Sequence, residues 1–331
     1  MGVEDHRARR LRDTARAFDA DGERRRCEAL GIALVAWDDP EYPEKLRPVK
    51  DAPLLLYALG SLEADGPAAA VVGSRTATPY GLRQGRRLGR ELAAAGVRVV
   101  SGLARGVDAQ AHEGALAAGG TTWAALGSGL ARVYPPENEP LARRILDGGG
   151  CLLSEFPLDA PPDRPHFTRR NRIISGLCWA TVVVEGRGQS GSLVTAHCAA
   201  EQHRELFAVP GPADSPLSEG PHHLLRTGAK VACSAEDVLR TLSDGVRLAA
   251  RHAANGRPNG GGRVPADTGG SLSLEYRKIL KWLVADAVTV DALCESTGIP
   301  IPRLVAILFE MELQGLVKPF PGQRYGKKDD Y

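Results

Sequence analysis

The chain has 331 residues, enough to bury one large core and to carry a small second domain. It contains no run of about 18 apolar residues and begins without the apolar region of a signal peptide, so we expect a cytoplasmic protein without membrane association. The formal net charge of +2 excludes a global polycation, so any nucleic acid must be held by a local positive field.

Strands and helices are expected to alternate through the first two thirds of the chain. After an irregular, Pro-broken lead-in at 38–60, runs of small and β-branched residues predict strands at 68–73, 97–102, 121–129, 151–157, 180–186 and 205–211. Helical patterns lie between them at 81–96, 108–119 and 192–203. Continuous apolar strands that alternate with helices indicate an α/β fold, with a mostly parallel sheet and helices on both faces.

The C-terminal part has a different organisation. Residues 244–270 include NGRPNGGGRVPADTGG, a composition typical of a flexible linker. Beyond it, apolar residues at helical spacing predict three short helices, the second ending at Gly298, and a final hairpin. Three helices and a hairpin indicate a winged helix at 271–326, followed by a tail at 327–331.

Three segments share the order strand, Gly-rich loop, helix, and their loops read GSRTATPYG, SGLARGVD and EGRGQSGS. In an open parallel sheet such loops lie together beyond the carboxyl ends of the strands. Glycine lets the backbone approach an anion, and a helix N-terminus adds N–H donors and a positive dipole. Arg75 and Arg105 lie inside the first two of these loops. Together the loops predict an anion site at this edge of the sheet.

The first two loops lack the phosphate-binding motifs of nucleotide enzymes, and the third lacks a nucleophile elbow. There is no Gly-x-x-x-x-Gly-Lys-Ser/Thr, and neither GSRTATPYG nor SGLARGVD fits the Gly-x-Gly-x-x-Gly that opens the first helix of a dinucleotide-binding fold. GQSGS has Ser192 where a nucleophile elbow needs its last glycine. Asp108 and His112 stand four residues apart on one expected helix, but a helix cap with a packed histidine is the interpretation that we favour. No nucleophile and base can be paired, so we expect binding, not enzymatic catalysis, and no cofactor.

The six cysteines are widely spaced and form no Cys-x-x-Cys. In a chain of this length they indicate reduced, mostly buried thiols, and we expect no metal site.

The stretch RPHFTRRNRIISGL (164–177) groups Arg169, Arg170 and Arg172 beside Phe167. Proteins hold single-stranded nucleic acid with positive grooves along the phosphates and with aromatic rings against the bases. A GC-rich genome explains the general excess of 34 Arg over 8 Lys, but not this cluster. The alternative is a solvated loop with Phe167 in the core. We expect an apolar helix at RIISGL to place the arginines at its N-terminal end, on the rim of the Gly-rich loops, which favours a binding role.

These motifs, in this order, resemble the DNA-processing protein A (DprA/Smf) family. The resemblance rests on GSRTATPYG, SGLARGVDAQAHEGAL, TTWAALGSGLARVYP, LLSEFP, FTRRNRIISGL, VVVEGRGQSGSLVTAHCAAEQHRELFAVPG and SEGPHHLLRTGAKV. It runs from about Trp37 to Val231, and the C-terminal module looks like the winged helix of many members. It implies an extended Rossmann-like core at 37–243, with residues 1–36 as a short helical remnant of a longer N-terminal domain.

The resemblance also implies partners and a binding site. A member would bind and protect incoming single-stranded DNA, load the RecA recombinase during natural transformation, and work as a homodimer. The DNA-binding residues implied for this chain are Gly73, Ser74, Arg75, Arg105, Phe167, Arg169, Arg170, Asn171, Arg172, Gly191 and Ser192.

Two other functions are considered. The cytokinin-activating phosphoribohydrolases have a similar Rossmann variant, but their Pro-Gly-Gly-x-Gly-Thr-x-x-Glu motif is replaced here by GRGQSGSLVTAH, without the glutamate. A transcription regulator would use the winged helix, but residues 299–314 contain only one basic residue, Arg303. A recognition helix normally carries more positive charge and more side chains that read bases.

Overall fold

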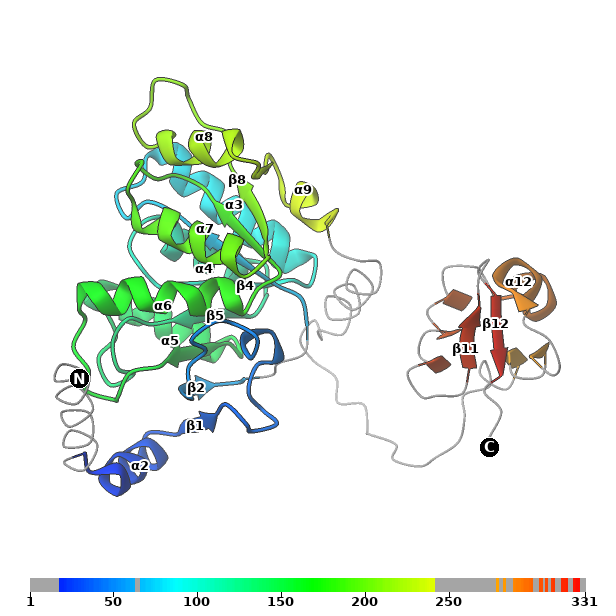
Figure 1. The fold of residues 1–331 in the computed structure, drawn as a ribbon, viewed down its shortest axis with the longest axis horizontal. Coiled ribbons are helices and arrows are strands. Elements are labelled where there is room, and N and C mark those ends of the chain that lie inside the picture. Colours follow the sequence, from blue (N-terminus) through cyan, green and yellow to red (C-terminus); the bar gives the residue numbers. More distant parts are fainter. Residues whose placement is uncertain are drawn as a thin grey trace, which may run out of the picture. The chain divides into compact units, whose positions relative to one another are not determined.

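The computed structural model of the chain describes residues 18–62, 66–241, 278–279, 282–283, 288–299, 304–305, 307–308, 311–312, 317–320 and 324–327. The chain divides into two compact units, residues 1–257 and 258–331. The larger unit runs from blue to yellow in Figure 1, and the smaller one is orange and red.

A nine-stranded sheet, counted over the described residues, forms the centre of the larger unit. Its spatial order is β1-β2-β6-β5-β4-β3-β7-β8-β9. Neighbouring strands from β6 to β9 are parallel, whereas β2 pairs antiparallel with β1 and with β6. The strands are β1 (Ile32–Ala36), β2 (Leu55–Gly60), β3 (Ala68–Val72), β4 (Arg98–Ser101), β5 (Thr122–Ala125), β6 (Cys151–Ser154), β7 (Ala180–Val183), β8 (Glu205–Ala208) and β9 (Lys230–Val231).

Strand β3 lies in the middle of the sheet, between β4 and β7. Ala69 is in register with Val99 of β4 on one side and with Ala180 of β7 on the other. From β3 the chain builds the sheet outward through β4, β5 and β6, and then returns to β3 and builds the other side through β7, β8 and β9. Open α/β sheets form a ligand crevice at such a reversal, outside the carboxyl ends of the strands.

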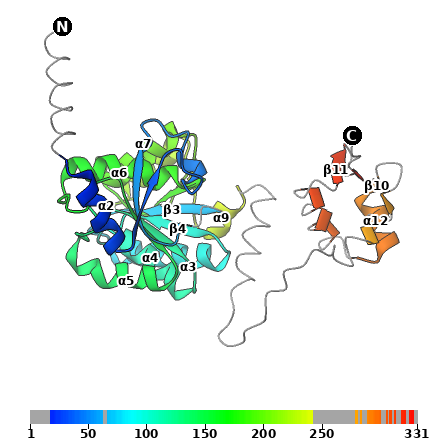
Figure 2. The ribbon, with the colours of Figure 1, turned by 90° about the horizontal axis from the view of Figure 1, so that it is seen from below.

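Helices cover both faces of the sheet, as Figure 2 shows with α6 and α7 on one side and α3, α4 and α5 on the other. The first side has a core that includes Ile173 and Ala196, and the second has one that includes Leu88 and Ala111. The central strands have both faces buried, which explains their continuous apolar sequence. The helices are α2 (Ala20–Ala29), α3 (Pro79–Ala94), α4 (Val107–Ala117), α5 (Glu139–Asp147), α6 (Arg164–Gly176), α7 (Gly191–Glu201), α8 (Glu219–Arg226) and α9 (Ala235–Leu239), with 3-10 turns η1 (Glu44–Leu46) and η2 (Pro136–Asn138).

The N-terminal segment is more than a helical remnant. Within the predicted 1–36 segment the structure has both helix α2 and strand β1, and β1 extends the sheet by pairing Ile32 with Leu59. Cys27 of α2 and Ile32 are buried in the core shared with β6 and α5. Residues 18–36 are therefore an integral edge of the larger unit, and the expected boundary between 36 and 37 does not separate two folded parts.

The smaller unit has the elements expected of a winged helix. Helix α12 (Val290–Thr297) ends at Gly298, which takes the left-handed conformation with φ of 69°. A three-stranded sheet has the order β10-β12-β11, with β10 (Val288–Thr289), β11 (Val317–Phe320) and β12 (Arg324–Lys327). Its core contains the positions expected from helical spacing, Ile279, Leu283, Leu304, Ile307, Leu308 and Met311.

The expected linker at 244–270 lies outside the described residues. Among the residues that the structure describes, no helix has the length and apolar composition needed to cross a membrane.

Candidate nucleic-acid interface

A pocket of about 680 Å³ opens where β3 and β7 end. Its walls come from the loop after β3, the loop between β4 and α4, the loop after β7, and one side of α6. The lining residues are Val72, Gly73, Ser74, Arg75, Thr76, Ala104, Asp108, Arg164, Phe167, Thr168, Arg170, Asn171, Ile174, Arg187, Gln189, Ser190, Gly191, Ser192, Thr195 and Leu217. The three Gly-rich loops therefore meet at the reversal in strand order, as expected of an anion site.

A buried carboxylate fixes the loops after β3 and β7 to each other. Glu185 follows β7, is almost fully buried, and accepts hydrogen bonds from the Thr78 backbone N–H (2.9 Å) and hydroxyl (2.6 Å). Thr78 is also the N-cap of α3, where its hydroxyl oxygen accepts from the Gly81 N–H. Gly81 packs so closely on the Glu185 carboxylate that a side chain at this position has no space. The pocket rim is thus set by packing and hydrogen bonds.

Helix α6 begins earlier than the sequence suggested. Asp163 is its N-cap and Pro165 lies in its first turn, so the arginine cluster is in the middle of the helix and not at its N-terminal end. Because side chains three and four residues apart share a helix face, the cluster is divided between two faces. The residues of α6 that line the pocket are Arg164, Phe167, Thr168, Arg170, Asn171 and Ile174.

Arg170 is buried, with 3% of its surface exposed. Its guanidinium donates to the carbonyl oxygen of Gly102 (2.8 Å) and to that of Ala125, which lie at the ends of β4 and β5. Burial lowers the pKa of Arg170 to about 10, and the Asp108 carboxylate opposes this shift. Arg170 was predicted as a DNA contact, but this geometry makes it a residue that positions the loops around the pocket.

Arg169 and Arg172 lie together on another face of α6 and share one carboxylate. Glu155, which is 3% exposed, lies 3.0 Å from Arg169 and 2.6 Å from Arg172. Neither arginine lines the pocket. Arg169 remains largely exposed, whereas Arg172 is mostly buried and held by this ion pair. The sequence grouped three arginines that the helix separates.

Phe167 lies half-buried at the centre of an aromatic and cationic cluster. The Arg75 guanidinium carbon is 4.9 Å from the ring centroid, a distance typical of a cation–π contact. On another side the Tyr134 ring lies 5.6 Å away, centroid to centroid, and Arg105 lies 5.9 Å from the Tyr134 centroid. Arg105 also pairs with Glu137, and this hydrogen bond lowers the pKa of the Glu137 carboxyl. The predicted residues Arg75, Arg105 and Phe167 are therefore brought together.

The remaining predicted residues are in or beside the pocket wall. Ser74 and Asn171 are buried, and the Asn171 side-chain amide donates to the Gly191 carbonyl oxygen at 3.1 Å. The Ser192 hydroxyl lies 2.8 Å from the Ser190 hydroxyl at the start of α7. These contacts connect α6 to the N-terminal end of α7, which faces the pocket.

Three residues of this site were missed by the sequence analysis. Arg164 and Arg187 line the pocket and are exposed. Tyr134 completes the aromatic cluster, and its only signal was an aromatic residue in the segment RVYPPEN after a strand. Among the described lining residues, four arginines face a single carboxylate, Asp108. The pocket is therefore strongly positive although the whole chain is nearly neutral.

The pair Asp108 and His112 has structural partners. Asp108 is buried and accepts from the Gly102 N–H at 3.1 Å; burial raises its pKa, and Arg170 opposes the rise. His112 is fully buried, its Nδ1 lies 2.7 Å from the Thr122 hydroxyl, and burial lowers its pKa to about 3. This confirms a packed histidine. The expected cap at Asp108 is wrong, because the N-cap of α4 is Gly106, and Asp108 lies inside the first turn and supports the loop after β4. Over the described residues, no three His, Cys, Asp or Glu side chains are grouped as metal ligands.

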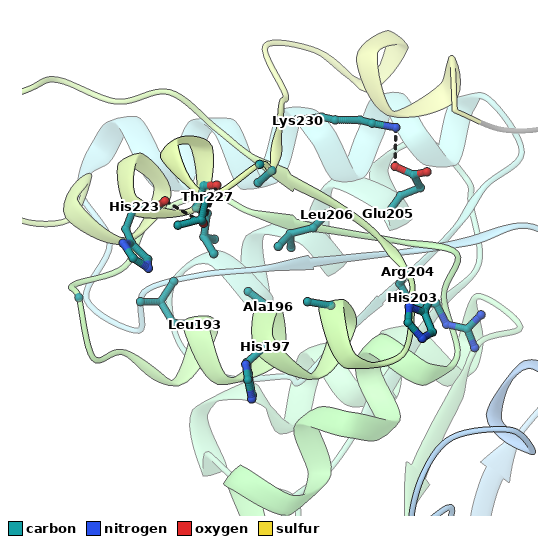
Figure 3. Close-up of a pocket in the computed structure, with 15 residues that line it drawn as sticks. Leu193, Ala196, His197, His203, Arg204, Glu205, Leu206, His223, Thr227 and Lys230 are labelled. Atoms are coloured by element: carbon teal, nitrogen blue, oxygen red, sulfur yellow. Dashed lines mark hydrogen bonds and ion pairs between the residues drawn. The ribbon is translucent and has the colours of Figure 1, made fainter.

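A second hollow, of about 760 Å³, lies between α7, α8 and the beginnings of β8 and β9 (Figure 3). Its basic residues include His197, His203, Arg204 and Lys230, and Lys230 pairs with Glu205 at 2.6 Å. It contains Leu206 at the start of β8 and is not at the carboxyl ends of the strands. The pocket at β3 and β7 is therefore the better candidate for an anion site.

Fold and pocket together define an extended Rossmann-like α/β protein with a positive, aromatic-lined pocket at the strand ends, joined to a winged helix. The family model for DNA recombination-mediator protein A matches residues 33–243, and the model for the DprA winged helix domain matches residues 264–323. The chain belongs to the DNA recombination-mediator protein A family. The expected family and fold class are thereby confirmed.

Relatives and solved structures agree with this assignment. The Protein Smf of Escherichia coli is 42% identical over 290 residues, which cover 87% of this chain and 76% of the relative. The structure of DprA from Streptococcus pneumoniae has a TM-score of 0.61 and 40% identity, over 64% of this chain and 75% of its own. DNA processing protein A from Helicobacter pylori, whose structure is described for its single-stranded DNA binding mode, has a TM-score of 0.57 and 29% identity, over 63% of this chain and 94% of its own.

Proposed function

We propose that the pocket at β3 and β7 binds single-stranded DNA, with phosphates against its exposed arginines, Arg75, Arg164 and Arg187, and a base against Phe167. The observation that carries the proposal is the half-buried Phe167 ring, 4.9 Å from the Arg75 guanidinium carbon, inside a pocket with four arginines. Aromatic stacking combined with positive charge is the usual way to hold a single strand without base specificity. The single-stranded DNA binding mode described for the Helicobacter pylori relative supports this proposal.

Binding without turnover is part of the proposal. Asp108 is the single carboxylate among the described lining residues, and it is engaged by the Gly102 N–H and by the charge of Arg170. A general base must be free to approach the proton that it removes. The loop GRGQSGSLVTAH also lacks the glutamate that a phosphoribohydrolase would use.

In the cell, we propose, the protein works in the cytoplasm as a homodimer that protects incoming strands and loads the RecA recombinase onto them. This part rests on family membership. We further propose residues 244–270 as a flexible linker and the winged helix as an accessory domain that the strand-binding pocket does not require.

The binding proposal is tested by fluorescence anisotropy with labelled oligo(dT) and with duplex DNA at several salt concentrations. The Phe167 ring, which stacks on an unpaired base, predicts tighter binding of the single strand. Four to six phosphate contacts predict a log–log salt slope of about −3 to −4. Phe167→Ala should cost roughly 1–3 kcal/mol of affinity with little change in slope, whereas Phe167→Tyr, which keeps a ring, should bind normally.

Thermal melts of the same proteins show whether each variant is folded. Tighter binding of the duplex, or an affinity that does not depend on salt, would contradict the proposal. Release of a base from nucleoside monophosphates by the purified protein would support the enzymatic alternative instead.

A further inference from the structure

Helix α3 carries a row of arginines that the pocket does not use. Arg83, Arg86 and Arg90 are exposed, and at 3.6 residues per turn they lie within about 60° of one another around the helix. The opposite face, with Leu88 and Leu92, is buried in the core. We call Arg83, Arg86 and Arg90 the α3 stripe.

The α3 stripe has no counter-charge within the described part of the chain. No carboxylate there forms an ion pair with any of its three arginines. The nearby carboxylates are already engaged, since Glu91 pairs with Arg87 and Glu113 pairs with Arg144.

Several exposed arginines on other helices have an acidic partner, and those described without an ion pair, such as Arg25 of α2 and Arg226 of α8, do not form a row along one helix face. Arg24 pairs with Glu28, Arg143 with Glu139, and Arg240 with Glu236, each within one helix turn. Such pairs stabilise a helix by a few tenths of a kcal/mol, and like charges at the same spacing destabilise it by a similar amount. The three arginines of the α3 stripe thus repel one another, and a bound polyanion would reduce this repulsion.

The stripe begins beside the pocket. Arg75 and Thr76 line the pocket, and α3 starts three residues later at Pro79. With a rise of 1.5 Å per residue, Arg83 lies about 6 Å and Arg90 about 16 Å along the helix from its first residue. The three exposed positions therefore follow one another along α3 away from the pocket, in the helix layer formed by α3, α4 and α5 (Figure 2).

We propose that a single DNA strand leaving the pocket near Arg75 continues along α3, with its phosphates on Arg83, Arg86 and Arg90. This inference rests on the proposed function of the pocket and extends its binding site. The stripe contains no aromatic residue, so it contributes charge without base stacking. Its contribution appears only when the strand is longer than the pocket.

The test uses the full-length protein and two lengths of oligo(dT), about 6 nucleotides, near the lower end of the usual site sizes of single-strand binders, and about 30 nucleotides, well above them. The variant is the triple substitution Arg83→Ala, Arg86→Ala, Arg90→Ala. The matched control is Arg24→Ala, Arg143→Ala, Arg240→Ala, which removes the same charge from paired positions. A third variant changes the stripe to lysines.

We expect the stripe variant to bind the short strand normally. For the long strand, its salt slope should fall in magnitude by about 2, and its affinity at about 0.1 M salt by up to about a hundredfold, because three phosphate contacts are lost. The control triple should bind both strands like the wild type. The lysine triple should keep most of the slope, because it keeps the charge.

The possible failures are distinguishable. Unchanged binding of the long strand by a folded stripe variant overturns this inference and leaves the pocket intact. Equal losses on both strands also overturn it, because the arginines would then act on the pocket or on the fold. A wild-type protein that binds neither strand overturns the proposed function, and this inference with it.

Discussion

From the sequence, both Arg75 and Arg172 are expected to contact phosphate, but the two side chains have different surroundings in the structure. Arg75 is exposed at the pocket rim above Phe167, whereas Arg172 is held by Glu155 outside the pocket. We predict that Arg75→Ala lowers the magnitude of the single-strand salt slope by about 0.7 and that Arg172→Ala leaves it unchanged. Anisotropy titrations at four or more salt concentrations measure both slopes, and a loss of slope in Arg172→Ala alone would reverse the assignment.

Arg170 should matter for stability more than for phosphate contact. In Arg170→Met the carbonyl oxygens of Gly102 and Ala125 lose their donor, and Asp108 loses its compensating charge in a buried site. Leaving buried hydrogen-bonding groups without their partner typically costs about 1–3 kcal/mol, and more where a charge is involved. Urea unfolding should show a loss of this order for Arg170→Met, and a change within about 0.5 kcal/mol for the control Arg25→Met at an exposed position of α2.

His112 makes the free energy of unfolding depend on pH. Its pKa is about 3 in the folded protein, against an ordinary value of 6.5 for an unfolded chain, so between these values the unfolded chain binds a proton that the folded protein does not. Stability is then lost as pH falls below 6.5, by at most about 1.4 kcal/mol per pH unit from this group. We predict that His112→Asn, which keeps a polar atom toward Thr122, flattens the curve of unfolding free energy between pH 6.5 and 4.

The difference between the His112→Asn and wild-type curves isolates this group from the acidic residues that titrate in the same range. Parallel curves for the two proteins would show that His112 does not carry the effect.

At the scale of single elements, α6 shows which features of the site local sequence patterns predict and which they do not. The strands, the Gly-rich loops and their meeting at the strand ends follow from local patterns, and so does the selection of Arg75 and Phe167. Which face of the helix each arginine occupies does not follow from local patterns, because it depends on the residue at which the helix begins. Asp163 and Pro165 set that start, and the helical period then directs Arg170 inward and Arg169 and Arg172 to Glu155.

The partners of these residues are also distant in the sequence. Ala125 and Gly102 reach Arg170 only because β4 and β5 end beside α6, and Tyr134 reaches Phe167 from the loop before α5. The spacing of apolar residues and the composition of the sequence give no information about such contacts, because tertiary packing determines them. Of the missed arginines, Arg187 had a sequence signal, because it lies in the third Gly-rich loop as Arg75 and Arg105 lie in the first two. Arg164 had none, because only the start of α6 shows that it faces the pocket.

The start of α3 should be sensitive to one hydroxyl group. Thr78→Val removes the oxygen that caps the helix and that donates to Glu185, but nearly keeps the side-chain volume. The lost cap and the Glu185 Oε1 left without its hydroxyl donor predict a destabilisation of roughly 1–3 kcal/mol, while Oε2 keeps the backbone N–H of residue 78. Denaturant unfolding measures it, with Thr168→Val on the exposed side of α6 as control, and equal stabilities of the two variants would contradict this role of Glu185.

At the scale of the whole molecule, all residues of the pocket and of the α3 stripe belong to the larger unit. We therefore predict that deletion of residues 271–331 leaves most of the affinity for oligo(dT) and the salt slope intact. Anisotropy titration of the truncated protein checks this, beside a thermal melt that shows a cooperative transition. If the truncated protein melts normally but no longer binds oligo(dT), the binding site lies in the winged helix instead.

The hydrogen bonds between Thr78 and Glu185 join residues that are 107 positions apart. At the usual rate of synthesis on the ribosome, about 5–20 residues per second, roughly 5–20 s pass between the two residues. During that interval β3 has no neighbour on its β7 side, and the first Gly-rich loop has no carboxylate to hold it. A chain whose translation stops before Glu185 therefore carries Arg75 but lacks the pocket wall after β7, so incomplete products cannot assemble the pocket and compete with the finished protein for DNA.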